Sequence, residues 1–137
     1  MNGFLLDTNV VSELRKGERC ASKVNAWAQT VQPNQDFLSV LVVGELRRGA
    51  ILKRRTDRAA ADALEQWIAR LTHLYSDRIL PSTLEIAQEW GRLSALRTIP
   101  PEDGLLAATA NVHRLTFVTR ITRNVQGLGD AVKNPLI

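Results

Sequence analysis

The fold is best read outward from the stretch Phe4-Leu5-Leu6-Asp7-Thr8-Asn9-Val10. The apolar run 4–6 predicts a buried strand, and Asp7 follows at its expected carboxyl end. Thr8 and Asn9 come next, and both residue types begin helices by capping free backbone N–H groups. A strand, an acid at its tip and a helix that leaves at once form half of a βαβ unit, and open parallel sheets bind ligands at such tips. Asp7 is therefore the first candidate site residue.

Strands and helices alternate along the remainder of the chain. The sequence predicts helices over 8–15, 21–31, 40–53, 58–75, 82–97 and 102–113, and short strands over 36–39, 79–81, 116–119 and 131–133. A loop is expected over 120–129, and Ser82-Thr83-Leu84-Glu85 fits a capping box at the start of its helix. The alternation predicts the α/β class, with a central, mostly parallel sheet of four to five short strands flanked by helices.

The bulk numbers favour an ordinary globular protein. A chain of 137 residues with 45% hydrophobic residues is expected to form one domain over 1–137. No apolar stretch approaches the roughly 18 residues of a membrane span, and no signal region begins the chain. The single cysteine, Cys20, excludes an internal disulfide framework and a cysteine-based zinc site. We therefore expect a cytoplasmic protein that does not contact a membrane. Its net charge of +4 favours polyanionic partners only weakly.

Glu45 is the second candidate site residue. At helical spacing it shares a face with Leu41, Gly49 and Leu52. A carboxylate on a largely apolar stripe is costly unless it is paired or bound to a metal. A salt bridge to Arg48 at i+3 is the structural alternative.

Asp103 is the third candidate. It lies in the first turn of the predicted helix 102–113, behind Pro100-Pro101. An acid in this position stabilises the helix dipole and can cap free N–H groups, so a purely structural role is the alternative.

The three acids are more informative together than singly. Asp7, Glu45 and Asp103 each lie at the predicted end of a strand or at the start of the helix that follows, which is one edge of a parallel sheet. Clustered carboxylates repel one another, and one would protonate unless a cation lies among them. An all-oxygen ligand set suits Mg²⁺ or Mn²⁺. On a basic protein, such an ion indicates phosphodiester chemistry.

The motifs that contain these acids match those of a known family. The chain resembles PIN-domain ribonucleases, specifically the VapC/FitB type of toxin in bacterial type II toxin–antitoxin pairs. The resemblance covers essentially the whole chain, and its motifs are Leu5-Leu6-Asp7-Thr8-Asn9-Val10, Leu38-Ser39 through Gly44-Glu45-Leu46-Arg47-Arg48-Gly49, Asp103-Gly104-Leu105-Leu106-Ala107-Ala108-Thr109-Ala110, Phe117-Val118-Thr119-Arg120 and Val132-Lys133-Asn134-Pro135.

The resemblance implies a function and partners. Asp7, Glu45 and Asp103 would hold Mg²⁺ or Mn²⁺, and a metal-activated water would hydrolyse a phosphodiester of transfer RNA or another structured RNA. The family implies a homodimer that a VapB-like antitoxin silences. Operator DNA would be bound only through that antitoxin.

Asn124 departs from the family pattern. The family commonly continues Thr-Arg-Asn-x-x-Asp-Phe, whereas this chain has Thr119-Arg120-Ile121-Thr122-Arg123-Asn124-Val125. An amide oxygen can ligate a hard metal or orient its water, but it adds no negative charge. We therefore expect weaker metal affinity than in relatives with four acids, and the number of metal ions stays open.

Thr8, Asn9 and Thr119 are expected beside the acids, where they would orient a metal's water or a phosphate. Helix capping is the alternative for Thr8 and Asn9. The candidates for RNA contact are the arginines that follow the strand 116–119 and those of the basic run after Glu45, namely Arg120, Arg123, Arg47 and Arg48. For the last two, the alternative is a solvated helix end.

Two other classes share an acid at the first strand tip. Haloacid-dehalogenase phosphatases expect a second Asp where this chain has Asn9, and response-regulator receivers expect a late lysine that 117–120 lacks. A stronger rival is a PIN-like binding module with attenuated catalysis, which acts in an antitoxin/repressor complex or binds RNA. Retention of three acids favours the nuclease.

Overall fold

The structure is a computed structural model that describes residues 3–19, 21–128 and 132–134. Its described part contains a parallel sheet of five strands in the order β3-β2-β1-β4-β5. The strands are β1 (Phe4–Leu6), β2 (Asp36–Ser39), β3 (Ile79–Leu80), β4 (Thr116–Val118) and β5 (Val132–Lys133). The predicted α/β class with a central parallel sheet is confirmed. Residue 131, where an edge strand was expected to begin, lies outside the described residues.

The centre of the sheet is its most apolar part. Leu5 of β1 pairs with Phe37 on one side and with Phe117 on the other. Leu5, Leu38 and Phe117 are buried. Strands that are apolar along their whole length are typical of a parallel sheet whose two faces are covered by helices.

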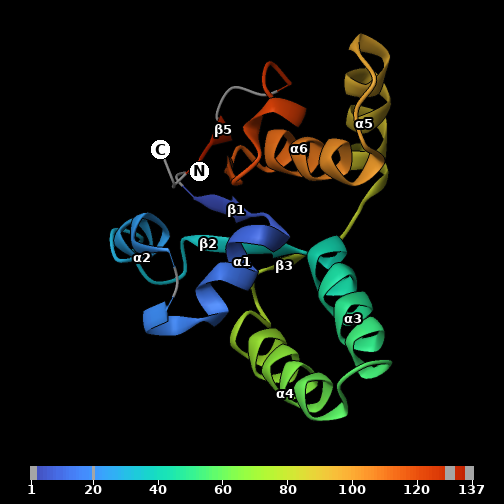
Figure 1. Ribbon diagram of the computed structural model, residues 1–137. Coiled ribbons are helices and arrows are strands. Elements are labelled where there is room, and N and C mark those ends of the chain that lie inside the picture. The colour runs from blue at the N-terminus through green and yellow to red at the C-terminus, as the bar shows by residue number, and fades with distance from the viewer. Residues whose placement is uncertain (1–2, 20, 129–131, 135–137) are drawn as a thin grey trace.

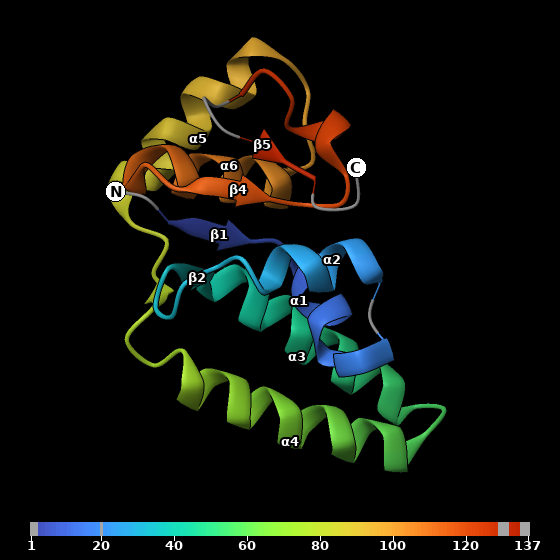
Figure 2. The same ribbon diagram turned by 90° about the vertical axis from the view of Figure 1, so that its left-hand side faces the viewer.

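Helices α3 to α6 form two hairpins at opposite ends of the molecule, with the sheet between them (Figures 1 and 2). The packed pairs are α3 with α4 and α5 with α6. The α-helices are α1 (Thr8–Arg15), α2 (Ser22–Ala28), α3 (Val40–Arg54), α4 (Arg58–Leu74), α5 (Leu84–Leu96) and α6 (Pro101–His113), and two 3-10 helices are η1 (Gly17–Arg19) and η2 (Thr122–Asn124). None of the helices in the described ranges is long and apolar enough to cross a membrane.

The range of α1 was predicted correctly, but its capping residue and the ends of two other helices were not, and side-chain hydrogen bonds explain these differences. The cap of α1 is Asp7 itself rather than Thr8 or Asn9, because its Oδ1 accepts from the Thr8 N–H at 2.8 Å. The capping box at Ser82 does not form. Thr83 is the capping residue instead, because its Oγ1 accepts from the Ile86 N–H at 3.2 Å, and the helix predicted from residue 82 begins at Leu84.

The helix predicted over 21–31 ends at Ala28. The Thr30 hydroxyl donates to the Trp27 carbonyl at 2.6 Å, so a side chain satisfies the acceptor that the next turn would have used. The loop expected over 120–129 contains η2, and residue 129 lies outside the described residues.

Helix α6 is buried on several sides, as its apolar sequence predicted. The residues of α6 that are buried include Gly104, Leu106, Ala107, Ala108, Thr109 and Ala110. The absence of a side chain at Gly104 lets α5 approach closely, because a Cβ there would lie 2.9 Å from Trp90 Cδ1. This close packing fixes the N-terminal turn of α6, which carries Asp103.

Candidate functional site

The tips of β1 and β4 lie side by side at one edge of the sheet. The backbone N–H of Asp7, which follows β1, donates to the Val118 carbonyl at 2.9 Å. The chain runs from β1 to β2 and β3 on one side, then crosses to β4 on the other. Asp7 and Thr119 therefore flank the point where the strand order reverses, which is where parallel sheets bind ligands.

Asp7 is held by hydrogen bonds to both carboxylate oxygens. Its Oδ1 accepts from the Thr8 N–H, and its Oδ2 accepts from the Thr119 hydroxyl at 2.7 Å and from Asn9 Nδ2 at 3.1 Å. The residue is only 8% exposed. Burial raises the pKa of Asp7, Asp103 raises it further, and the three hydrogen bonds oppose that rise.

The segment after β4 is fixed to this cluster by the same side chains. Thr119 Oγ1 accepts from the Ile121 N–H, and Asn9 Oδ1 accepts from the Arg120 N–H, each at 3.1 Å. The Asn134 side-chain amide donates to the Arg120 carbonyl at 3.0 Å. Asn9 and Thr119 thus place the loop as well as the acid.

Glu45 reaches the site from α3. The buried face of that helix is formed by Val42, Leu46 and Ala50, so the apolar stripe predicted through Gly49 and Leu52 was wrong. Both of these residues are exposed, and Glu45 lies at the border of the buried face.

The charge of Glu45 is not balanced by a basic partner. Within the described ranges it forms no ion pair, so the alternative pairing with Arg48 is wrong. Burial raises the pKa of Glu45, and Glu102, Asp7 and Asp103 raise it further, while the Thr8 hydroxyl partly offsets the rise.

Asp103 lies in the first turn of α6. Its Oδ2 accepts from Asn124 Nδ2 at 3.1 Å. The residue before the helix, Pro100, makes no side-chain cap. Asp103 therefore adds its charge to an N-terminus that it shares with Glu102, and an amide from η2 fixes its orientation.

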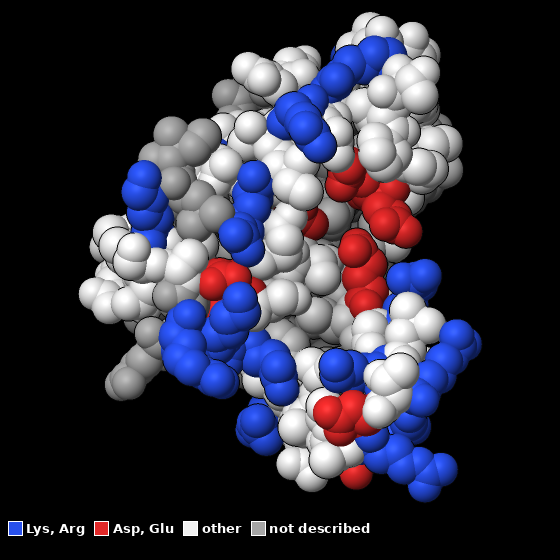
Figure 3. Space-filling model, viewed as in Figure 1, with Lys and Arg blue, Asp and Glu red and all other residues white. Residues whose placement is uncertain are grey.

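One small pocket brings these side chains together. It has a volume of about 270 Å³, and its lining residues are Asp7, Thr8, Asn9, Glu45, Asp103, Ile121 and Asn124. The acids come from the end of β1, from α3 and from α6, so the sheet edge unites three distant parts of the chain. Figure 3 shows acidic side chains in the hollow between the two helical hairpins, with Lys and Arg side chains gathered on either side of it.

The donor set of this pocket fits a hydrated hard cation. Across the residues that the structure describes, no group of three or more Asp, Glu, His or Cys converges closely enough to hold an ion directly. However, the Thr8 hydroxyl is buried in this same pocket, where it interacts with Glu45 without a well-formed hydrogen bond. Mg²⁺ keeps several of its waters and binds through one or two carboxylates, so carboxylate, hydroxyl and amide oxygens spread around the pocket suit it.

The four predicted RNA-contacting arginines differ in their surroundings. Arg120 donates to Glu13 at 3.1 Å, and Arg47 donates to Glu65 on α4 at 3.3 Å. Arg48 and Arg123 are exposed, and in the described part of the chain their guanidinium groups form no ion pair. These last two are the freer candidates for a phosphate.

Glu13 was not among the residues that the sequence pattern predicted near the site. This residue is 5% exposed, and its carboxylate accepts from the Ala21 N–H at 2.6 Å, from Lys16 at 2.9 Å and from Arg120 at 3.1 Å. The Lys16 hydrogen bond and then the Ala21 N–H lower the pKa of Glu13. Its position three residues after the buried Val10 was the available signal, because it places an acid on the inward face of α1.

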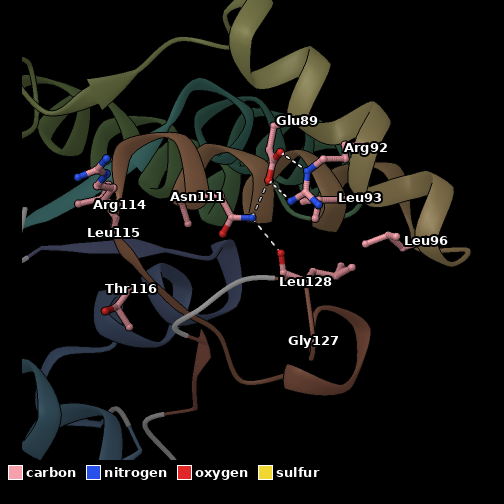
Figure 4. Close-up of a pocket in the computed structure, with 11 residues that line it drawn as sticks. Glu89, Arg92, Leu93, Leu96, Asn111, Arg114, Leu115, Thr116, Gly127 and Leu128 are labelled. Atoms are coloured by element: carbon pink, nitrogen blue, oxygen red, sulfur yellow. Dashed lines mark hydrogen bonds and ion pairs between the residues drawn. The ribbon is translucent and has the colours of Figure 1, made fainter.

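A larger cavity of about 750 Å³ lies elsewhere (Figure 4). It opens beside Arg114 and Thr116, at the start of β4, which is the opposite edge of the sheet. Its one carboxylate, Glu89, is already paired with Arg92 and with Asn111. The smaller acidic pocket is therefore the candidate functional site.

Comparison with known proteins identifies the family of this chain. The model of the PIN domain family matches residues 4–122. Toxin FitB of Neisseria gonorrhoeae is 33% identical over 139 residues, which cover 96% of this chain and 97% of FitB. VapC ribonuclease Y4jK of Sinorhizobium fredii is 33% identical over 141 residues, covering 96% of each protein. The solved structure of FitAB bound to an IR36 DNA fragment superimposes with a TM-score of 0.85 at 29% identity, covering 98% of this chain and 96% of the other.

Proposed function

This chain belongs to the PIN-domain family and to its VapC/FitB toxin group, and we propose that it is a divalent-metal-dependent endoribonuclease. The observation that carries the proposal is the single pocket lined by Asp7, Glu45 and Asp103. Mg²⁺ is the expected ion and Mn²⁺ its substitute, held by these three acids with Thr8 or Asn124 beside them. When bound, such an ion supplies an activated water and neutralises charge on the phosphate.

The residues of the chain divide the remaining work. Asp7 is fixed by its hydrogen bonds, so it presents a rigid carboxylate edge. Glu45 has no basic partner among the described residues, so its carboxylate would be free to hold the ion or to accept a hydrogen bond from a water beside it. Thr119 and Asn9 orient Asp7 and the loop that follows β4.

The RNA would bind across the acidic hollow and be held at its basic margins. The exposed side chains of Arg48 and Arg123 are the preferred phosphate contacts, whereas those of Arg47 and Arg120 would first have to leave Glu65 and Glu13. Transfer RNA or another structured RNA is the substrate class that the family suggests. Such a substrate implies action in the cytoplasm.

The partners follow from the same relatives. FitB is named a toxin, and FitAB has been solved on DNA. We propose a homodimer that is silenced by a VapB-like antitoxin and reaches operator DNA only through that antitoxin.

A second candidate is a PIN-like binding module with attenuated catalysis. It is favoured by the amide at Asn124 and by the lack, within the described ranges, of three acids that converge directly on one point. Such a module would act in an antitoxin/repressor complex or bind RNA without cutting it.

Cleavage of labelled transfer RNA separates the two candidates. Antitoxin-free protein is incubated in Mg²⁺, in Mn²⁺ and in chelator, beside Asp7→Ala and Asp7→Asn. The asparagine variant keeps an oxygen for the Thr8 N–H, so its loss of activity reports the charge rather than the helix cap. Cleavage at discrete sites that requires metal and is lost in both variants supports the nuclease. RNA or antitoxin binding without cleavage in any metal supports the binding module.

A further inference from the structure

Arg97 makes an unusual set of contacts just after α5. Its guanidinium group donates to the backbone carbonyl of Asn124 at 2.8 Å and to that of Gln126 at 3.0 Å. The Arg123 carbonyl accepts from both terminal nitrogens, at 3.4 and 3.5 Å. One side chain therefore binds three carbonyl oxygens of a short segment that lies more than twenty residues further along the chain.

The segment 122–126 has few other polar anchors of its own. Within it, the Val125 N–H donates to the Thr122 carbonyl at 3.1 Å, which is a local turn. Val125 is buried and fixes the segment by apolar contact. The polar links from the α5–α6 hairpin are the Arg97 contacts and the hydrogen bond from Asn124 Nδ2 to Asp103 at 3.1 Å.

The chemistry of these contacts requires a forked cation. Three carbonyl oxygens that point toward one place repel one another unless donors lie between them. A guanidinium group has five N–H donors in a rigid plane and stays charged, whereas a lysine ammonium is a single point with three donors. Arg97 therefore fixes the backbone of Asn124, and the side chain of Asn124 in turn fixes the carboxylate of Asp103.

We propose that Arg97 is a positioning residue of the nuclease site, which acts through Asn124 to hold Asp103 in the orientation that binds the metal. This inference rests on the proposed function. A purely structural Arg97 would stabilise the fold without altering metal binding, so the two roles are separable.

The test compares Arg97→Gln and Arg97→Lys with Arg92→Gln. Arg92 is the matched control, because it lies on α5, the helix that ends directly before Arg97, and its partner is Glu89 rather than the segment 122–126. The readouts are the thermal midpoint, the side-chain amide resonance of Asn124 by ¹⁵N NMR, hydrogen exchange over 122–126, Mn²⁺ binding by calorimetry, and kcat and KM for RNA cleavage.

In Arg97→Gln we expect the Asn124 resonance to shift, exchange over 122–126 to accelerate, and Mn²⁺ affinity and kcat to fall about tenfold, since residues that orient metal ligands typically contribute 10–100-fold. KM changes less than kcat, and Arg97→Lys recovers part of the loss. In the double variant Arg97→Gln/Asn124→Ala, the loss equals that of Asn124→Ala alone, because both changes break the same connection.

An unchanged Asn124 resonance, an equal loss in Arg92→Gln, or losses that add in the double variant would each overturn the proposal. The NMR and exchange measurements need neither metal nor RNA. A wild-type protein that cuts no RNA would therefore refute the proposed nuclease while these readouts still decide whether Arg97 holds Asn124 against Asp103.

Discussion

The side-chain amide of Asn124 donates to Oδ2 of Asp103 at 3.1 Å, so an uncharged donor lies where the family commonly has a fourth acid. In this arrangement the nitrogen of the amide, rather than its oxygen, faces the carboxylate. Asn124 therefore acts first on the orientation of Asp103.

Replacing Asn124 by Asp should lower the stability of the metal-free protein and raise its affinity for Mg²⁺. Two carboxylates would then lie about 3 Å apart, and their repulsion favours protonation or a cation between them. We expect a lower melting temperature without metal and tighter Mg²⁺ binding by calorimetry. Asn111→Asp is the control, because Asn111 also donates to a carboxylate, Glu89, but far from the acidic pocket. Unchanged metal affinity and unchanged cleavage rate in Asn124→Asp would refute the expectation that the missing fourth acid weakens metal binding.

Thr119→Val should impair the site more than the fold. The substitution removes the donor to Asp7 and leaves the Ile121 N–H without its acceptor. We expect metal affinity and kcat to fall by roughly 10–100-fold, and Thr119→Ser to retain most of both. Thr109→Val is a matched change of a buried threonine, whose hydroxyl bonds only within α6. If Thr119→Ser is as impaired as Thr119→Val, the hydroxyl is not the cause.

Glu45→Gln should stabilise the metal-free protein at neutral pH. Because the pKa of Glu45 is raised in the folded state, the wild type loses stability as pH rises from the unfolded value of about 4.3 through the folded one. Glutamine does not ionise, so the variant escapes this loss. We expect a melting temperature higher by roughly 1–3 °C at pH 7 and no difference below about pH 4.

Mg²⁺ should reduce the difference in melting temperature between Glu45→Gln and the wild type. A ligand that binds only the native state stabilises it by an amount that grows with the logarithm of its affinity, and Glu45→Gln would bind Mg²⁺ more weakly than the wild type. Thermal scans of both proteins with and without Mg²⁺ measure the effect, with the exposed acid Glu85→Gln as control. A variant that is less stable than the wild type at pH 7, or a gain that persists at pH 4, contradicts the account.

Two glycines in neighbouring helices should respond to alanine in opposite ways. Gly91 faces open space on α5, so Gly91→Ala gains about 1 kcal/mol of helix propensity. A Cβ at Gly104 would lie 2.7 Å from Ile99 Cδ1 and 3.0 Å from Trp90 Nε1, and such overpacking costs about 1–3 kcal/mol. Chemical denaturation should therefore show a gain for Gly91→Ala and a loss for Gly104→Ala. Equal gains at both positions would show that α5 moves aside easily.

Much of this architecture could be predicted from local patterns. Alternating apolar runs and helical periods identified the elements, and the shared edge of parallel strands predicted that Asp7, Glu45 and Asp103 would meet. All three line the same pocket. This succeeded because the rule needs only the order of strands and helices along the chain.

The contacts that organise the site could not be predicted in this way. The cap formed by Asp7, the bond from Asn124 to Asp103, and the binding of loop carbonyls by Arg97 all depend on the exact placement of a side chain against a distant or competing group. Ser82 satisfied the sequence pattern of a capping box, yet Thr83 is the residue that caps α5. Such choices depend on small free-energy differences that no sequence period records.

The pairing of 4–6 with 116–118 has a consequence for protein synthesis. Domains fold from the N-terminus as they are made, and the first half of this chain already contains Asp7 and Glu45. However, the Thr119 hydroxyl and the Asn124 amide that orient Asp7 and Asp103 arrive only when translation has passed residue 124. A growing polypeptide still attached to its ribosome therefore carries the acids without the groups that align them. The proposed hydrolytic centre would be assembled only after β4 and the segment that follows it have been made.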